Sequence, residues 1–193
     1  GKTAEEIANY YHEQDVNTFN KFNFSYDMYT STMAKEHKEK VKEYFMDLYN
    51  NGFIYEKEIE QEYCNNCNTF LSDREIIGIC PVCNHECNGD QCDNCLTSLE
   101  SKDVKEKKCK TCKKDVVLKM NKHLYFELSK FQKDIEEYIE KNKDHWRKNA
   151  VGETQKFLDL GLIDRAATRQ LNWGVEVPIK GFEDKRIYVW IEA

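Results

Sequence analysis

Cysteine provides the clearest chemical signal in this sequence of 193 residues. Eight of its nine cysteines form four Cys-x-x-Cys pairs between positions 64 and 112. Two residues between the cysteines let both sulfur atoms of a pair reach one Zn²⁺ ion at about 2.3 Å. Such a pair is a zinc knuckle. The pairs predict two tetrahedral zinc sites with a structural role, because four sulfur ligands leave no position for a catalytic water. The predicted ligands are Cys64, Cys67, Cys80, Cys83, Cys92, Cys95, Cys109 and Cys112.

A disulfide framework or a redox pair is the alternative use of these cysteines. Their number is odd, the chain is longer than a typical disulfide-rich domain, and no secretory segment opens the sequence. These observations favour zinc. Cys87 is left over and is interpreted as a small apolar filler, while His85 stands close enough to Cys83 to replace a missing ligand.

The composition limits the classes of partner. Charged residues make up 33% of the chain, the net charge is −6, and no apolar run is long enough to cross a membrane. Two tetrathiolate zinc sites would move the formal charge to about −10. We therefore expect a cytoplasmic protein without membrane or DNA partners, in which any RNA contact is local. The five histidines form no paired general-base arrangement, and no glycine-rich phosphate loop is present.

The first part of the chain predicts helices and one strand. Thr3-x-x-Glu6 is a capping-box signature and predicts a helix that ends near Gln14. Phe22–Tyr29 is an aromatic strand candidate. Thr32 is expected to cap a second helix, which Gly52 ends. Its apolar face consists of Val41, Tyr44, Phe45, Leu48 and Tyr49.

The rest of the chain alternates in the same way around the cysteines. Residues 54–126 are polar and cysteine-rich, and predict short strands in a domain whose core is partly replaced by metal. Ser129-x-x-Gln132 opens another helical pattern, and the pattern toward Leu158 ends at Gly161. Residues 187–193 predict a strand. Helices and strands on both sides of a zinc module indicate an insertion within an α/β domain.

Several sequence blocks carry a family resemblance. They are Phe22-Asn23-Phe24-Ser25-Tyr26-Asp27, Thr30-Ser31-Thr32, the four knuckles, Thr168-Arg169-Gln170-Leu171-Asn172-Trp173-Gly174, Gly181-Phe182-Glu183-Asp184-Lys185 and Tyr188-Val189-Trp190-Ile191-Glu192-Ala193. In this order they resemble methionyl-tRNA synthetase, a class I aminoacyl-tRNA synthetase. The resemblance implies a Rossmann-like nucleotide-binding catalytic domain interrupted by an α+β zinc-knuckle insertion, the connective peptide.

The resemblance also implies a division of the chain. Residues 1–32 would end the first half of the catalytic domain, residues 33–185 would form the insertion with its knuckles at 60–115, and residues 186–193 would begin the second half. The chain begins with Gly1 and is read as an excised piece. The His-Ile-Gly-His block of the class would precede it, and the Lys-Met-Ser-Lys-Ser block would follow it.

Site residues follow from the same resemblance. Trp190 and Ala193 match positions of the methionine pocket, and Glu192 stands where the family usually has Asp. Arg169 is expected to have an anchoring or charge-stabilising role in catalysis. The stretch that contains it resembles a loop facing ATP, in which Trp173 and Gly174 would shape the nucleotide side and Glu176 would reach the ribose.

A full enzyme of this kind would use ATP and Mg²⁺ to activate L-methionine and would then charge tRNA(Met). The chain alone would be inactive. Knuckle spacing permits sequential pairing, but the family implies nested pairing, with Cys80, Cys83, Cys92 and Cys95 at one ion and the outer four cysteines at the other. The alternative function is a free-standing zinc-ribbon interaction module without catalysis.

Overall fold

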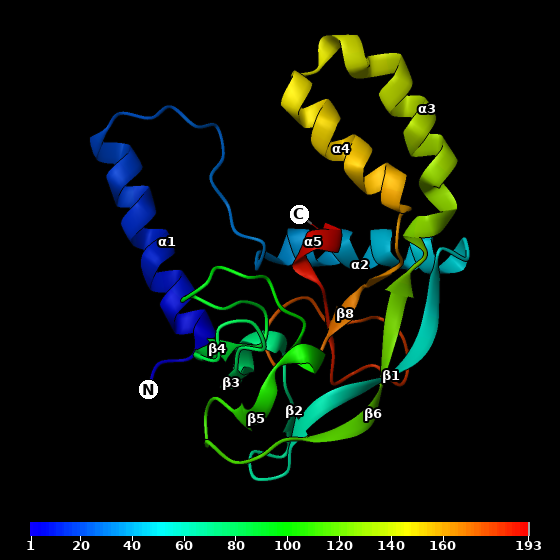
Figure 1. Cartoon of the computed structure of the whole chain (residues 1–193). Helices are drawn as coiled ribbons and strands as arrows, with labels where there is room; N and C mark the ends of the chain where they lie inside the picture. Colours follow the sequence, from blue (N-terminus) through cyan, green and yellow to red (C-terminus); the bar gives the residue numbers. More distant parts are fainter. Residues whose placement is uncertain (193) are drawn as a thin grey trace. The chain divides into compact units, whose positions relative to one another are not determined.

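A computed structural model describes residues 1–192 as a mixture of helices and strands (Figure 1). The chain divides into two units. Unit 1 consists of residues 1–56 and 124–193, and unit 2 consists of Lys57–His123. The strands β1 (Ile54–Cys64) and β6 (Val117–Phe126) are neighbours in one sheet, and each begins in one unit and ends in the other. The expected mixture of helix and strand is confirmed.

Unit 1 is mainly helical. Its helices are α1 (Ala4–Lys21), α2 (Lys35–Asn50), η3 (Leu128–Phe131), α3 (Gln132–Asn142), η4 (Lys143–His145), α4 (Lys148–Leu160) and α5 (Val189–Glu192), where η marks a short 3₁₀ helix. Its short strands are β7 (Arg165–Ala166), β8 (Thr168–Arg169) and β9 (Arg186–Ile187). β8 pairs antiparallel with β9, and the end of β6 pairs antiparallel with β7.

The core of unit 1 forms around one face of α2. Val41 and Phe45 are buried on this face, as their helical spacing predicts. Phe45 is fully buried and lies in one cluster with side chains from several later segments. The buried members of this cluster are Val41, Phe45, Ile54, Leu124, Ala167, Val175, Val177, Phe182 and Ile187. The cluster therefore fixes the loop 170–185 and β9 onto α2.

The ends of α2 follow the sequence only in part. Gly52 ends the helix in a left-handed conformation with φ 75°, as expected. The predicted cap at Thr32 is wrong, because α2 begins at Lys35 after Ala34, which makes no side-chain capping bond. Tyr44 was expected on the apolar face but remains 55% exposed.

The first helix is longer than predicted. The capping box forms, since Thr3 Oγ1 accepts a hydrogen bond from the Glu6 amide and the Glu6 carboxylate accepts one from the Thr3 amide. The helix continues to Lys21 and does not end near Gln14, because no glycine or proline interrupts it. The predicted strand over 22–29 is wrong. Its aromatic rings pack on one another and on Phe19, whose ring centre lies 5.1 Å from that of Tyr29.

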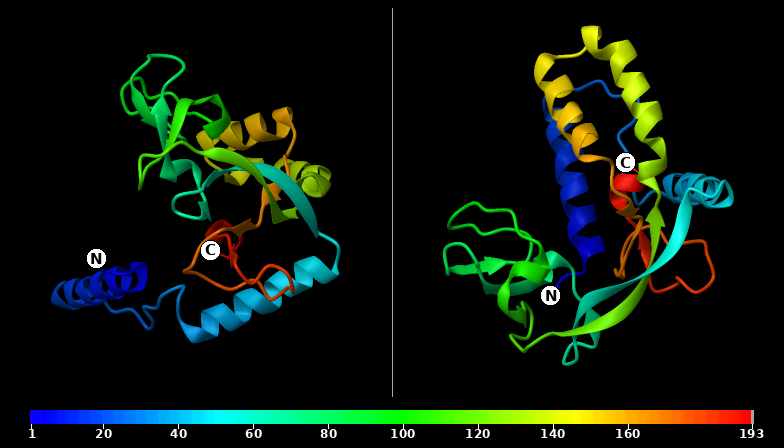
Figure 2. Two further views of the ribbon diagram at one scale, coloured as in Figure 1. Left: turned by 90° about the horizontal axis from the view of Figure 1, so that it is seen from below. Right: turned by 45° about the vertical axis from the view of Figure 1, so that its right-hand side comes forward.

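Helices α3 and α4 form a hairpin, and they run side by side in Figures 1 and 2. Gln132 joins its two ends, since its amide donates to the Leu158 carbonyl at 3.0 Å and accepts from the Leu162 amide at 2.8 Å. Ser129 does not cap α3, because its Oγ donates to Asp164 Oδ1 at 2.7 Å. Gly161 ends α4 as predicted.

Unit 2 is built from strands and turns. It contains most of β1 (Ile54–Cys64) and of β6 (Val117–Phe126), together with β2 (Thr69–Phe70), η1 (Asp73–Glu75), β3 (Ile76–Ile79), β4 (Glu86–Asn88), η2 (Ser101–Asp103) and β5 (Lys105–Cys109). β3 is the central strand of a three-stranded antiparallel sheet in the order β4-β3-β5. β1 and β6 are longer than the short strands expected between residues 54 and 126.

The end of the described chain differs from the prediction. The strand expected over residues 187–193 is only Arg186–Ile187 long, and the chain then turns into α5. The Tyr188 amide donates to the Ala167 carbonyl at 2.9 Å, and the Ile191 amide donates back to the Tyr188 carbonyl at 2.8 Å. The bond from Ile191 to Tyr188 closes a helical turn, so the backbone is not extended as a strand requires.

We predict that Phe45→Ala lowers the free energy of unfolding of unit 1 by about 3–5 kcal/mol, because it leaves a cavity in the centre of the core. Urea unfolding measures this change. Tyr44→Ala removes an aromatic side chain of similar size from the preceding position, which is exposed. This substitution should change the free energy of unfolding by less than about 1 kcal/mol. Equal effects of the two substitutions would contradict the position of the core.

Candidate functional site

The four knuckles share one backbone conformation. The residue directly after the second cysteine of each pair has a left-handed conformation, with φ between 53° and 61°, at Asn68, Asn84, Leu96 and Lys113. In the last three knuckles its amide also donates to the carbonyl of the first cysteine, at 2.8–3.0 Å. Leucine and lysine rarely adopt this conformation, which costs about 1–2 kcal/mol. Something must therefore stabilise these turns, and a metal ion bound to both cysteines would do so.

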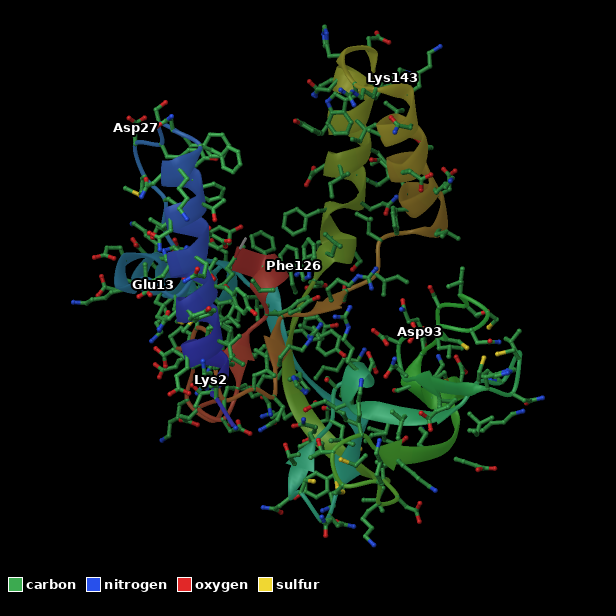
Figure 3. All side chains as sticks on the ribbon, turned by 90° about the vertical axis from the view of Figure 1, so that its left-hand side faces the viewer. Lys2, Glu13, Asp27, Asp93, Phe126 and Lys143 are labelled. Carbon is green, nitrogen blue, oxygen red and sulfur yellow. The ribbon has the colours of Figure 1, made fainter. Side chains whose placement is uncertain are left out.

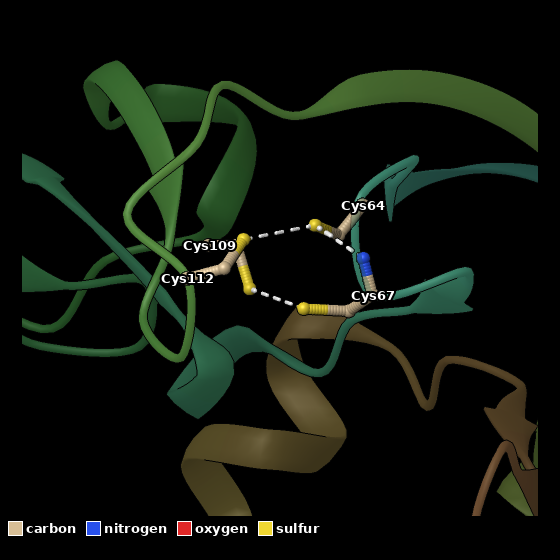
Figure 4. A group of neighbouring side chains, drawn as sticks. All are labelled: Cys64, Cys67, Cys109 and Cys112. Atoms are coloured by element: carbon tan, nitrogen blue, oxygen red, sulfur yellow. Dashed lines mark hydrogen bonds between the residues drawn. The ribbon is translucent and has the colours of Figure 1, made fainter.

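The outer four cysteines converge on one point (Figure 4). Cys64 ends β1 and Cys67 lies in the turn that follows it, while Cys109 ends β5 and Cys112 lies in the turn after that strand. Cys64 Sγ lies 3.4 Å from Cys112 Sγ, and Cys67 Sγ lies 3.9 Å from Cys109 Sγ. Cys64 and Cys109 are buried, whereas Cys67 and Cys112 are half-buried.

The inner four cysteines form a second cluster of the same kind. Cys80 Sγ lies 3.8 Å from Cys95 Sγ, and Cys83 Sγ lies 3.5 Å from Cys92 Sγ. Within each cluster all four sulfur atoms lie within 4.8 Å of one another. The knuckles are therefore nested, as the family resemblance implies, and the sequential pairing that spacing also permits is not formed.

Both clusters fit a tetrahedral metal ion. Four sulfur atoms at about 2.3 Å from one zinc ion lie about 3.8 Å from one another, which is close to the distances found here. All nine cysteines are free thiols, so the disulfide alternative is not formed. The donor set is also right, because Zn²⁺ binds four cysteine thiolates in structural sites.

Backbone amides donate hydrogen bonds to several of these sulfur atoms. The Cys67 amide donates to Cys64 Sγ and the Val82 amide donates to Cys80 Sγ, each at 3.4 Å. The backbone N–H of His85 lowers the pKa of Cys83 to about 6. The backbone N–H of Lys114 likewise lowers the pKa of Cys112 to about 7. Amide donors of this kind stabilise the ionised form that binds metal.

Cys87 behaves as the expected filler. It is 5% exposed on β4, packs in the hydrophobic cluster that holds Cys80 and Cys92, and does not belong to the four converging sulfur atoms. Burial raises the pKa of its thiol. His85 is not needed as a substitute ligand, because all four inner cysteines are in place. Its Nδ1 lies 3.0 Å from the Cys83 carbonyl oxygen.

Arg169 is held in a defined position on β8. Its Nη1 donates to the carbonyls of Ala166 and Thr168, both at 2.9 Å. Its guanidinium carbon lies 3.8 Å from the ring centre of Tyr188, which is a cation–π contact. No carboxylate pairs with Arg169 among residues 1–192, so it is not an ordinary surface ion pair. The sequence did not indicate Tyr188 as its support.

The loop after Arg169 contains the three residues that were expected on the nucleotide side. Trp173 is 37% exposed. A Cβ atom added to Gly174 would lie 3.2 Å from Arg186 Cβ, so a side chain there would crowd the neighbouring strand. Glu176 accepts a hydrogen bond from Lys42 on α2 at 2.9 Å, and this bond lowers its pKa. The sequence analysis missed Lys42, which is far away in the chain.

The predicted methionine contacts lie at the end of the described chain. Trp190 on α5 is 77% exposed. Ala193 lies outside the described residues. Glu192, which stands where Asp is usual, has a buried side chain, and its Oε2 lies 3.6 Å from His37 Nε2. Burial raises the pKa of Glu192, and His37 opposes that shift. His37 is a second residue that the sequence analysis missed.

Comparison with known proteins extends over the whole chain. A family model described as "tRNA synthetases class I (M)" matches residues 1–193. The chain belongs to this family. The family resemblance stated from the sequence blocks is therefore confirmed.

The relatives and the solved structures agree with the family. The chain is 49% identical over 191 residues to methionine--tRNA ligase 1 of Alkaliphilus oremlandii, and 47% identical over 195 residues to methionine--tRNA ligase of Bacillus cereus. These matches cover 99% and 100% of this chain, but only 35% and 36% of the relatives. The chain thus spans about a third of their length.

The fold is similar to that of Mycobacterium tuberculosis methionyl-tRNA synthetase in complex with methionyl-adenylate, with a TM-score of 0.65 and 19% identity. That match covers 100% of this chain and 33% of the other. The apo form of the same protein gives a TM-score of 0.60 at 20% identity, and covers 100% of this chain and 34% of the other.

Among the described residues, no helix is both long and apolar enough to cross a membrane.

We predict that the protein binds two zinc ions per chain and that single substitutions remove them one at a time. Cys92→Ser should reduce the zinc content from two to one through loss of the inner site, and Cys109→Ser should do so through loss of the outer site. Elemental analysis of the purified protein measures the content. The matched control is Cys87→Ser, which should keep both ions. A wild-type content of one ion or none would contradict the assignment.

Proposed function

We propose that this chain is part of a methionine–tRNA ligase, which activates L-methionine with ATP and transfers it to tRNA(Met). The single observation that carries this proposal is the end-to-end match to the family, joined to 49% identity with a relative of that name. Activity, substrates and partners belong to the longer protein, because the chain spans about a third of its relatives. The cytoplasmic location and the absence of membrane or DNA partners stay expectations from the sequence.

Unit 2 would contribute a structural zinc module. Its two tetrathiolate clusters would each hold one Zn²⁺ ion, and structural zinc supplies about 10–16 kcal/mol of apparent binding free energy to folding in small domains. Neither ion would take part in chemistry, since four sulfur ligands fill every coordination position of the zinc. In the proposed division of the chain, residues 33–185 form the insertion, between the ends of the two catalytic halves at 1–32 and 186–193.

Unit 1 would contribute one side of the active site. Arg169 is positioned by backbone carbonyls and Tyr188 and has no carboxylate partner among the described residues, so its charge is available to a phosphate. Trp173, Gly174 and Glu176 would lie on the nucleotide side. Trp190 would offer an apolar wall to the methionine thioether, together with Ala193.

ATP and Mg²⁺ would be bound mainly by segments outside this chain, where the family's two ATP signatures are expected. Bound Mg²⁺ supplies positive charge that offsets the phosphates. Arg169 would add fixed positive charge on the same developing anion, and fixed charge of this kind contributes much of such a rate enhancement. The alternative of a free-standing zinc-ribbon module does not account for the family match outside residues 57–123.

We predict that, in the full-length protein, Arg169→Ala lowers the rate of methionine-dependent ATP–pyrophosphate exchange by about 10²-fold, as for loss of one fixed charge donor. Trp190→Ala should instead raise KM for methionine about tenfold, equivalent to roughly 1.4 kcal/mol of lost aromatic contact. Arg165→Ala and Val189→Ala are matched controls next to the two positions, and both should retain wild-type kinetics. Wild-type kinetics in Arg169→Ala and Trp190→Ala would remove both residues from the proposed site.

We also predict that the 193-residue chain alone shows no methionine-dependent exchange, even when it is folded and holds two zinc ions. It carries one side of the site only, and catalysis of this kind depends on positioning all reacting groups together. The assay uses zinc-loaded chain with the full-length protein as positive control. Exchange activity that follows the purified chain through a final column would refute this division of the site.

A further inference from the structure

The α3–α4 hairpin carries a basic tip, here defined as residues 141–148. Its permanent cations are Lys141, Lys143, Arg147 and Lys148, with Asp144 as the single acid. All five side chains are exposed. Lys143 lies at the far end of the hairpin in Figure 3. In a chain with a net charge of −6, this is a local concentration of positive charge.

The rest of α3 has the opposite charge. Asp134, Glu136, Glu137 and Glu140 lie on the same helix below the tip, against the single cation Lys133. A polyanion would therefore be attracted to the end of the hairpin and repelled by its side. Any such contact would be confined to the tip.

Local stability explains only part of this charge. Lys141 and Lys143 lie at the end of α3, where cations interact favourably with the helix dipole, and Lys143 is also paired with Glu140 at 2.6 Å. Arg147 and Lys148 begin α4, where the dipole favours acids. The first turn of α4 contains no acid, and Arg147 makes no side-chain capping bond. Arg147 and Lys148 thus oppose the stability of their own helix.

An aromatic side chain lies among these cations. Trp146 is 36% exposed, and its ring meets that of Tyr138 edge to face at 6.0 Å between centres. This contact orients the indole while leaving part of it open. Cations next to an open aromatic ring are the combination with which proteins bind nucleic acid, through phosphates and through stacking on bases.

We propose that the basic tip binds the phosphate backbone of the tRNA substrate. The inference rests on the proposed function, which requires a tRNA partner. The side chains of Arg147, Lys148 and Lys141 make no hydrogen bond or ion pair within residues 1–192, so their charges are available. Arg147 and Lys148 contact phosphates, and Trp146 stacks on an accessible base or ribose beside them. RNA fits better than an acidic protein segment, because the indole offers a base-sized surface next to the charges.

The test uses the full-length protein and two charge-reversal variants of the same hairpin. Arg147→Glu/Lys148→Glu changes the tip. Lys133→Glu/Lys156→Glu makes the same change of charge on the sides of α3 and α4 and is the matched control. Measurements are KM for tRNA at several salt concentrations, methionine-dependent ATP–pyrophosphate exchange without tRNA, binding of an acidic polyglutamate peptide, and Tm.

The tip variant should raise KM for tRNA about tenfold or more and reduce its salt dependence by about one to two ions. Exchange without tRNA should stay unchanged, and Tm should not fall, because acids suit the start of α4. Trp146→Ala should also raise KM but keep the salt dependence. The control should keep KM within about twofold of wild type.

Several results would overturn the inference. Equal effects of the tip variant and the control would indicate a general charge effect, and no effect of the tip variant would exclude a contact. Unchanged tRNA kinetics with loss of binding to an acidic peptide would assign the tip to a protein partner. Absence of methionine-dependent exchange in the wild-type protein is a separate result, since it would refute the proposed function itself.

Discussion

The convergence of four thiols at each of two points is the constraint on which unit 2 depends. Its two hydrophobic clusters are small, and half or more of the buried members of each are cysteines. A core of this size does not hold a domain of 67 residues without a further staple. Metal ions at the two clusters would supply it. The left-handed residues after each knuckle are consistent with this, because their strain is acceptable only where stronger bonds fix the turn.

The sequence predicted what local rules control. Cys-x-x-Cys spacing gave all eight converging sulfur atoms, helical periodicity gave Val41 and Phe45, and Gly52 and Gly161 marked helix ends. The two wrongly predicted strands have one physical cause. A strand needs a partner strand, and neither the aromatic segment 22–29 nor residues 188–192 have one among the described residues. The aromatic run without a partner strand packs on itself, and residues 188–192 without a partner strand form a turn and a short helix.

Contacts between distant residues near Arg169 could not be predicted from the sequence. The blocks around Gln170 and Asp184 were noticed separately, yet Gln170 Nε2 donates to Asp184 Oδ2 at 2.8 Å and Lys185 Nζ donates to Gln170 Oε1 at 2.8 Å. The two blocks therefore form one structure that holds β8 against β9 and sets Arg169 above Tyr188. Periodicity does not report such contacts, because they join loops and depend on how the chain returns.

Positive charge gathers both next to the outer cysteines and at the tip of the α3–α4 hairpin, but for different reasons. A tetrathiolate zinc site has a formal charge of −2 and needs compensation from its surroundings. Lys108, Lys110, Lys113 and Lys114 flank the outer cysteines and can supply it. The inner cluster has no lysine or arginine between residues 80 and 95 and instead receives hydrogen bonds, such as the Val82 amide to Cys80 Sγ. The four lysines that flank the outer cysteines thus have a local explanation in the thiolates beside them. Arg147 and Lys148 have no such local explanation, because they lie at the start of α4, where the positive end of the helix dipole repels cations. For this reason charge at the hairpin tip, and not the larger number of lysines around the knuckles, indicates a partner outside the chain.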